Sequence, residues 1–539
     1  MGILTFLILL PLIGSAVIGI GSRWPGWPRR LALVFSLGTF ALSLLVWARF
    51  DSTVASYQLV ESVPWIPSFG ISYLIGVDGV SLLLVSLTAV LTPLSVLASW
   101  ESVQEKVSAF YAVLLVLESF LIGVFLAVDV FLFYVLWEAL LVPAFLLIGV
   151  WGGRRRVEAA TKFFLFTMGG SIFFLVGILV CYELHNVQAG TPSFDLRTWQ
   201  GLVMSDELQR WLFLAFFVGC AVKIPLFPLH AWLPDAHSEA PTGGSVILAG
   251  VLLKLGAYGL LRFAVPLFPE GARAFAPAIL TIAVIGILYG ALVAMVQRDV
   301  KRLVAYSSVS QLGFVALGIF SFDVAGVEGA IYQMVSHGIT TGALFLLVGM
   351  IHERRQTYLI EDLGGLKASM PRFAGVFLIV LLSSMGLPGL NGFVGELLIL
   401  LGAFQTAPSF AVAAGFGVVL VAGYLLWMYK RVMLGESPQP ARRREVTGGR
   451  AGAVSPWKLP SEERGSHDDR DGVGPRGSER SPNATQDGLQ DLTRRESVIL
   501  LPIVILIFWM GLAPGGFLRM LDGTAEAILP VAPVGVLEE

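Results

Sequence analysis

The chain has 539 residues, of which 56% are hydrophobic and only 14% are charged, and its formal net charge is −2. This composition excludes an ordinary soluble globule and is typical of a polytopic membrane protein, for which the lipid bilayer is the first expected partner. The net charge itself says little about partners, and the charges of the polar region 435–496 nearly cancel, which argues against a nucleic-acid-binding tail.

Apolar runs of about 20 residues, the length that crosses a bilayer as an α-helix, recur along the whole chain. The first run has no basic residue ahead of it and no small-residue cleavage site, so we expect it to be retained. The expected fold is an all-α polytopic membrane protein of about fourteen transmembrane helices. The spans are expected at residues 3–20, 31–48, 72–98, 108–128, 130–151, 163–181, 211–231, 243–262, 274–296, 303–320, 327–350, 373–401, 410–429 and 498–518.

The basic residues orient these spans, because loops on the cytoplasmic side are enriched in Lys and Arg. With the N-terminus outside, most basic residues outside the 435–496 region fall in inner loops: Arg23, Arg29, Arg30, Lys106, Arg154, Arg155, Arg156, Lys162, Arg298, Lys301, Arg302, Arg354, Arg355, Lys367, Arg372, Lys430 and Arg431. The outer side then holds only Arg49, Arg197, Arg210, Arg262, Arg273 and Arg519. We therefore expect a multi-pass protein of the cell (inner) membrane with both termini on the outer side.

Spans four to eight and nine to thirteen form two blocks of five, and an odd number of spans places the second block upside down. The fourth span of each block is interrupted, by Pro225 and Pro228 in the first and by Pro388 and Gly389 in the second. Paired interrupted helices point to the transport site in inverted-repeat folds. The expected domains are three N-terminal helices (1–107), two inverted five-helix repeats (108–272 and 273–434), a polar, disordered cytoplasmic insertion (435–496) and a C-terminal helix with its tail (497–539).

Two charges lie in the first block at membrane depth. Lys223 comes just before the prolines of its span, and Glu138 lies near the middle of FLFYVLWEALLVPAFLLIG. A lysine at the bilayer centre costs about 2.5 to 3.5 kcal/mol on insertion scales, so such residues usually lie on ion or proton paths. We expect the two residues to act as a pair on such a path. The alternative is a buried ion pair that only fixes helix register.

Three further residues are candidates for the same path. Lys254, in GVLLKLGAYGLL, has no acidic neighbour within a helical turn and lies too deep to reach either interface, so we expect a relay. Glu396, in NGFVGELLIL, is its counterpart in the second block; a capping or helix-pairing carboxylate is the alternative. His337 can change protonation near neutral pH and could bridge Lys254 to Glu396, although a hydrogen-bonded core histidine is an equal alternative.

Secondary candidates are weaker. Glu118 lies in the apolar run VLLVLESFLIG, whereas His230 and His237 belong to the turn after the first interrupted span, where they could take up protons. Asp78 is expected to pack or cap near the outer end of its span. The chain has no Cys/His cluster for an iron-sulfur centre and no glycine-rich nucleotide loop, so we expect no metal site and no cofactor on this chain.

Several stretches resemble the antiporter-like membrane subunits of respiratory complex I, over nearly all the chain except residues 435–496. They are GVDGVSLLLV, LFYVLWEALLVP, AVKIPLFPLHAWLPDAHSEAPTGGSVILAGVLLKLGAYGLLR, DVKRLVAYSSVSQLGF and GLPGLNGFVGELLIL. The central stretch is shared with subunits of Mrp-type antiporters and membrane-bound hydrogenases. QMVSHGITTGALFLLVGMIHER and the glutamate at position 396 are similar to the M-type (chain 4) subunit.

The resemblance implies a subunit of an NADH:quinone oxidoreductase that moves protons while electrons pass from NADH to quinone on other subunits. It implies that FMN, iron-sulfur clusters and quinone belong to partner subunits, and that neighbouring antiporter-like subunits are direct partners. It assigns the coupled pair to Glu138 and Lys223, the central relay to Lys254 and the terminal group to Glu396. A subunit of an Mrp-type Na⁺/H⁺ antiporter or of a membrane-bound hydrogenase, and a purely structural spacer, are the alternatives.

Overall fold

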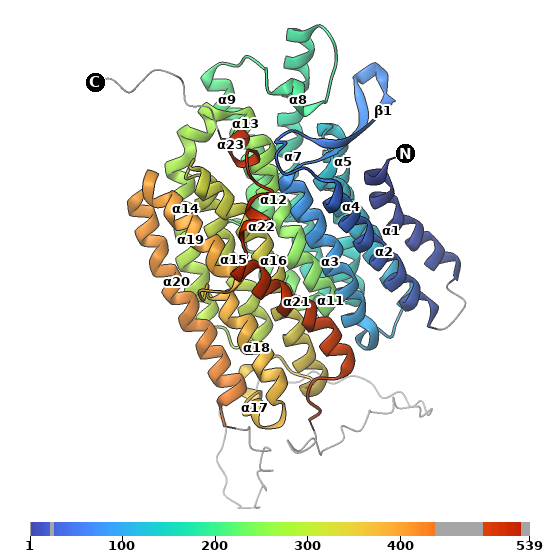
Figure 1. The fold of residues 1–539 in the computed structure, drawn as a ribbon, viewed down its shortest axis with the longest axis vertical. Helices are drawn as coiled ribbons and strands as arrows, with labels where there is room; N and C mark the ends of the chain where they lie inside the picture. The colour runs from blue at the N-terminus through green and yellow to red at the C-terminus, as the bar shows by residue number, and fades with distance from the viewer. Residues whose placement is uncertain (1, 22–25, 437–488, 530–539) are drawn as a thin grey trace, which may run out of the picture.

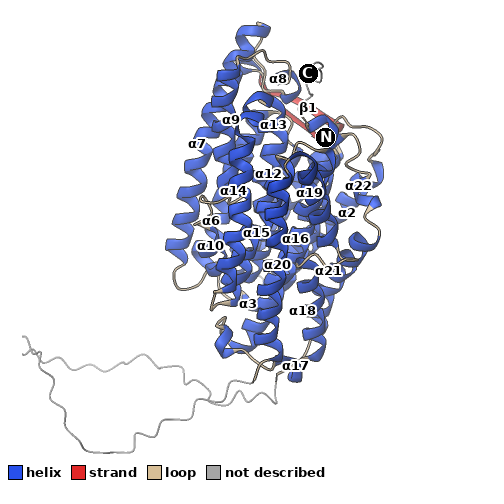
Figure 2. Cartoon of the chain, turned by 90° about the vertical axis from the view of Figure 1, so that its left-hand side faces the viewer, coloured by secondary structure: helices blue, strands red, loops and turns tan. Residues whose placement is uncertain are grey.

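The computed structural model describes residues 2–21, 26–436 and 489–529. Most of the expected 435–496 insertion and the acidic tail of Glu538 and Glu539 lie outside the described residues. The described part is an elongated helical bundle with one small β-hairpin (Figures 1 and 2). The all-α polytopic class is therefore confirmed.

In the described residues, twelve helices are long and apolar enough to cross a membrane. They are α1 (Ile3–Ile20), α2 (Trp27–Arg49), α3 (Gly79–Ser102), α4 (Val107–Leu126), α5 with α6 (Val130–Trp151), α7 (Arg156–Ala189), the segment α11 to α13 (Thr242–Leu267), α14 (Pro269–Met295), α15 (Val300–Ile319), α16 (Val324–Arg355), α20 with its last turn (Pro408–Leu434) and α21 (Arg494–Leu512).

The two remaining expected spans, 211–231 and 373–401, are each divided in the structure. The first consists of α9 (Asp206–Lys223) and the short α10 (Leu233–Glu239), and the second of α18 (Pro371–Ser384) and α19 (Asn391–Thr406). The fourteen expected spans thus correspond to twelve long helices and to two divided segments at the spans where an interruption was expected, because prolines and left-handed glycines interrupt the backbone hydrogen bonding there. In the second division Gly386 and Gly389 have φ of 71° and 90°.

The third span begins later than expected. Residues 71–77 do not start a helix at 72 but form strand β2 (Ile71–Val77), which pairs antiparallel with β1 (Gln58–Ile66). β-branched and aromatic residues favour this strand, and the apolar sequence hid the change of structure. Asp78 then caps α3, accepting a hydrogen bond from the Ser81 backbone nitrogen at 3.0 Å, as the expected capping role requires.

The bundle has two structurally different ends. The hairpin end carries β1, β2, α8 (Leu196–Trp199) and α23 (Thr524–Ile528), and the α17 end carries α17 (Leu366–Ser369) (Figure 1). Between them, α16 is buried over its whole membrane-spanning stretch and contacts α3, α11, α15 and α19. His337 lies on this central helix, Lys254 contacts it, and Glu396 lies on the neighbouring α19.

The last of the twelve long apolar helices, α21, crosses the bundle against α16, α18 and α19. Near the α17 end the two guanidinium nitrogens of Arg354 bind the Glu496 carboxylate at 2.6 and 2.7 Å, and the two side chains are only 12% and 2% exposed. Thr493 and Glu496 also form a capping box at the start of α21. This buried ion pair fixes the C-terminal helix to the central one.

Candidate functional site

Lys223 is the last residue of α9 and is completely buried. Its ammonium donates a hydrogen bond to the Trp137 carbonyl oxygen at 2.9 Å and lies 3.5 Å from the centre of the Trp137 ring. That carbonyl lies in the last turn of α5 (Val130–Ala139), where the helix dipole is negative. The carbonyl and the ring face solvate a cation that has no access to water.

Glu138 follows Trp137 directly, and its charge acts on Lys223. No ion pair within 4.0 Å joins the two side chains among the described residues, and Glu138 Oε1 is buried without a hydrogen-bond partner. Lys223 thus binds the backbone carbonyl of the residue before Glu138, and the two charged side chains do not form a direct ion pair.

Lys254 and His337 are in direct contact. Lys254 Nζ lies 2.7 Å from His337 Nδ1 and donates to the Ala249 carbonyl oxygen at 2.6 Å. A lysine ammonium only donates, so Nδ1 accepts and the ring hydrogen lies on Nε2 when Lys254 carries the proton. Both side chains are buried, and His337 Nε2 has no hydrogen-bond partner.

The backbone around Lys254 is irregular. Two π-helical segments, Leu248–Leu252 and Leu260–Ala264, flank α12 (Leu253–Gly259). Such π segments free carbonyl groups and occur frequently at functional sites. The first one supplies the Ala249 carbonyl that receives the Lys254 ammonium.

Glycines bring the neighbouring backbones together at this point. A Cβ at Gly338 of α16 would lie 2.7 Å from the Gly250 carbonyl oxygen, and one at Gly256 would lie 2.5 Å from the Cys220 carbonyl oxygen. Any side chain at these positions would push the helices apart. The segment that carries Lys254 is therefore held against α16 on one side and against the end of α9 on the other.

Glu396 is buried in the second turn of α19, below the division of that span. The Gln311 side chain of α15 hydrogen-bonds to it, and Gln311 Oε1 accepts a hydrogen bond from Gln333 Nε2 at 2.7 Å. Gln333 lies one helical turn before His337 on α16, and its own Oε1 has no partner. Two amides thus join Glu396 to α16, one helical turn before the histidine.

His237 occupies a different place from the one expected for a loop residue. It lies in α10, is fully buried, and neither ring nitrogen has a hydrogen-bond partner. Its ring packs against that of Phe345 on α16, with 5.3 Å between the centroids, and the charges of Lys301 and Lys254 both act on it.

Lys301 faces the α17 end. Its ammonium donates to the Ala240 and Ser238 carbonyl oxygens at 2.5 and 3.2 Å, and it lines a surface cavity of about 490 Å³ at that end. His230 is buried behind the first division. Of the two loop histidines, only His237 is thus close to the central lysine.

Glu118 is fully buried in α4, and neither carboxyl oxygen has a hydrogen-bond partner among the described residues. Thr92 of α3 acts on it. Helix α4 packs against α3, α5 and α12, but no hydrogen bond or ion pair joins Glu118 to another candidate in the described part of the chain.

Sequence reasoning missed three contributors. Trp137 solvates Lys223 through a carbonyl and a ring face, neither of which has a signature in sequence. Gln333 carries no charge, although a glutamine in an apolar span is a polar signal that could have found it. Lys301 was interpreted as a loop charge, because it follows Asp299 at the start of α15.

Titratable side chains thus lie together in three places of an apolar bundle: Lys223 binds the carbonyl next to Glu138, Lys254 contacts His337, and two glutamine amides join Glu396 to α16. Such groups at membrane depth can hold and release protons. No group of three or more His, Cys, Asp and Glu side chains suited to a metal ion occurs in the part of the chain that the structure describes.

A helical membrane bundle with buried Glu, Lys and His side chains at helix interruptions defines an antiporter-like class of protein. The family model for the transmembrane region of NADH:quinone oxidoreductases and Mrp antiporters matches residues 127–421. The model for the amino terminus of NADH-ubiquinone oxidoreductase chain 4 matches residues 24–124.

NADH-ubiquinone oxidoreductase chain 4 of Marchantia polymorpha is 41% identical over 528 residues, covering 98% of this chain and 97% of the relative. NADH-quinone oxidoreductase subunit M of Rhodobacter capsulatus is 45% identical over 453 residues, covering 80% of this chain and 86% of the relative. A chain of respiratory complex I from Thermus thermophilus, solved with bound NADH, aligns with a TM-score of 0.82 and 32% identity, covering 98% of this chain and 99% of that one.

The chain therefore belongs to the NADH:quinone oxidoreductase/Mrp antiporter transmembrane family. Within that family it is a member of the subunit M (chain 4) group.

Proposed function

We propose that the chain is a proton-translocating membrane subunit of an NADH:quinone oxidoreductase. The observation that supports this most strongly is the direct contact of Lys254 with His337, buried at the centre of the bundle. Two proton-carrying groups in contact at membrane depth have a high insertion cost. A spacer that only fills the membrane would gain nothing from them.

The proposed path runs from Lys223, with Glu138 as its counter-charge, to Lys254, then through His337 to Glu396. A proton that passes from Lys254 to His337 Nδ1 leaves the ring with a donor at Nε2, which has no hydrogen-bond partner in the described residues and is free to pass the proton on. The amides of Gln333 and Gln311 then hold the polar link to Glu396. Glu118, His230 and His237 have secondary roles, with His237 on the side where protons are taken up.

The coupling is electrostatic. A nearby carboxylate favours the protonated form of a lysine, so removing the Glu138 charge frees the Lys223 proton for the next group. Because the two side chains are separated around the Trp137 carbonyl, a small side-chain movement changes their attraction. Electron transfer on partner subunits would drive this movement, and the FMN, iron-sulfur clusters and quinone would reside there.

The orientation proposed from the basic residues places the hairpin end on the outer side and the α17 end in the cytoplasm. The described chain then begins and ends on the outer side, since the start of α1 and the short α23 lie at the hairpin end (Figure 1). The two five-helix blocks, 108–272 and 273–434, are proposed as inverted repeats that contribute Lys223 and Glu396 from their divided spans. Residues 435–496 are proposed as a cytoplasmic insertion.

The test is NADH-driven proton uptake in sealed membrane vesicles, with electron transfer and complex assembly followed in the same preparation. Lys223→Ala is expected to assemble and to lose pumping and coupled turnover together, and Glu138→Gln is expected to lose most pumping. Arg298→Ala, a charge change in an inner loop, is the matched control and is expected to do little. Full pumping by an assembled Lys223→Ala complex would show that the lysine is structural.

An Mrp-type Na⁺/H⁺ antiporter subunit is the second candidate, because the matching family includes that class. The curated relatives over most of the chain are subunit M and chain 4 proteins, which favours the redox-linked function. Sodium dependence of the vesicle signal without NADH would support the antiporter instead.

A further inference from the structure

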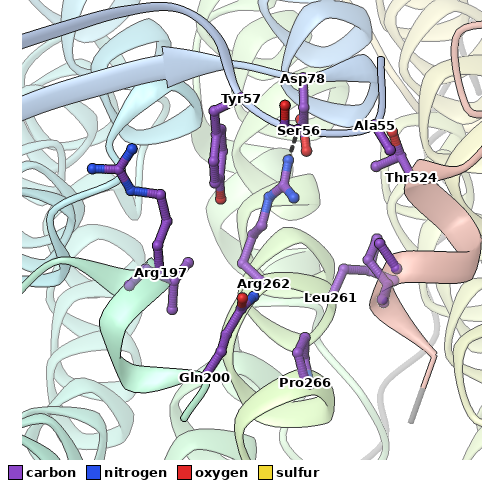
Figure 3. Close-up of a pocket in the computed structure, with 13 residues that line it drawn as sticks. Ala55, Ser56, Tyr57, Asp78, Arg197, Gln200, Leu261, Arg262, Pro266 and Thr524 are labelled. Carbon is purple, nitrogen blue, oxygen red and sulfur yellow. Dashed lines mark ion pairs between the residues drawn. The ribbon is translucent and has the colours of Figure 1, made fainter. Parts of the chain in front are cut away.

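The hairpin end contains a cavity that the proposed path does not use. Its volume is about 470 Å³, and its wall combines the chain before β1, α8, the π-helical Leu260–Ala264 segment and α23 (Figure 3). At its inner wall Arg262 forms an ion pair with Asp78, and the two side chains are only 8% and 4% exposed. The cavity therefore ends on a buried pair of opposite charges.

The ion pair continues inward through hydroxyl groups. An Arg262 terminal nitrogen donates to Ser81 Oγ at 3.3 Å, and Ser81 Oγ lies 3.1 Å from the Tyr258 hydroxyl. Tyr258 lies one helical turn beyond Lys254 on the same helix α12. Polar groups thus extend from the cavity to the turn next to the central lysine.

The surroundings of Arg262 differ from those of an ordinary helix brace. Its guanidinium carbon lies 5.4 Å from the centre of the Tyr57 ring and 5.1 Å from that of Tyr258, and its Nε is buried without a hydrogen-bond partner. A brace between α3 and α12 needs only the carboxylate contact. Here a permanent charge is held between two ring faces at the end of an open cavity.

We propose that this cavity is a vestibule on the outer face and that the Asp78–Arg262 pair is a gate between it and Lys254. A guanidinium does not lose its proton in proteins, so it cannot relay one. A fixed positive charge in a narrow polar passage excludes protons and other cations. While the ion pair is intact, protons from the outer side would not reach Lys254. When Arg262 is displaced, Ser81 and Tyr258 would face the vestibule. The proposal rests on the proposed function, because it needs Lys254 to carry protons.

The experiment is passive proton leak in sealed vesicles that contain the whole complex. An imposed proton gradient is allowed to decay without NADH, so the readout does not depend on pumping. Because Arg262→Gln alone would leave Asp78 buried and unpaired, the main variant is the double change Asp78→Asn with Arg262→Gln. Arg273→Gln, which removes a half-exposed arginine of α14 at the same end, is the matched control.

The double variant is expected to leak several-fold faster than the control, and adding Lys254→Met is expected to abolish the extra leak. A leak equal to that of the control, in an assembled double variant, would overturn the gate and leave the pair as a brace. If Lys223→Ala pumps normally while the double variant leaks, the proposed pump path fails and the gate does not.

A second measurement tests the gate in case the double variant does not assemble. Ser81→Cys in the otherwise native chain is treated from outside with a membrane-impermeant cationic thiol reagent, and the parent complex, in which Cys181 and Cys220 are buried, sets the background. Labelling that rises several-fold during NADH turnover is expected, since Ser81 becomes accessible only when the pair opens. Labelling at background level both at rest and in turnover would refute the gate.

Discussion

Gln333→Leu tests the link between His337 and Glu396 without changing any charge. Leucine has nearly the volume of glutamine but cannot donate to Gln311. The change removes the 2.7 Å hydrogen bond from Gln333 Nε2 and leaves the Gln311 oxygen buried without a partner. An unsatisfied buried acceptor costs about 1–3 kcal/mol, so we expect the free energy of unfolding to fall by about that amount.

The larger expected effect is on proton transfer. With leucine in place of Gln333, no amide of α16 binds Gln311. Proton transfer from His337 toward Glu396 should therefore slow at least tenfold. The assay compares NADH-driven proton uptake with NADH oxidation in vesicles, after assembly has been checked. Coupled turnover should fall with pumping, because electron transfer cannot proceed against a blocked relay.

The control for this experiment is Thr340→Val on the same helix. The Thr340 hydroxyl donates to the Ser336 carbonyl of its own helix at 3.0 Å and is buried, so valine removes a buried hydroxyl without cutting the path. We expect wild-type pumping from this variant. If Gln333→Leu also pumped at the wild-type rate, the path would not run through Gln333 and the proposed connection of His337 to Glu396 would be wrong.

Three further predictions concern stability and packing. Glu496→Ala leaves Arg354 nearly buried without its counter-charge, so the complex should lose about 3–5 kcal/mol in a thermal or denaturant unfolding assay while assembled complex still pumps. Gly338→Val should push α16 from the Gly250 carbonyl and lower both stability and pumping, whereas Gly375→Ala, where a Cβ meets open space, should do neither. His237→Gln should leave assembly unchanged, since neither ring nitrogen of His237 makes a hydrogen bond that the substitution would break; loss of assembled complex would show that the ring has a packing role.

The transmembrane class and most span positions follow from the sequence, because hydropathy and helix length are local properties. The β-hairpin does not, since Ile71–Val77 is as apolar as the helix after it and only its pairing with Gln58–Ile66 separates the two. The division after Lys223 was signalled by Pro225 and Pro228, and that after Ser384 by Pro388 and two glycines. Sequence therefore locates interruptions better than it locates a change from strand to helix.

The titratable residues of the candidate path were all recognisable as charges or a histidine in apolar runs. Their partners were not, because these come from distant parts of the chain. Lys254 meets a histidine 83 residues away, and Arg262 meets a serine 181 residues away. The charge pattern placed Arg262 on the outer side, whereas in the structure its side chain is almost completely buried. Charge placement sets which residues matter, and tertiary packing sets what each one touches.

The three lysines that are buried in the described part of the chain are solvated in the same way, and no sequence pattern predicts this. Lys223, Lys254 and Lys301 each donate to a backbone carbonyl at a place where regular α-helical hydrogen bonding stops: the last turn of α5, a π segment and the end of α10. A carbonyl stabilises the ammonium by its dipole but cannot accept the proton permanently. Each lysine can therefore keep its charge in an apolar bundle and still release a proton to a better acceptor. The helix interruptions thus supply the local solvation that a proton path across a dry bundle requires.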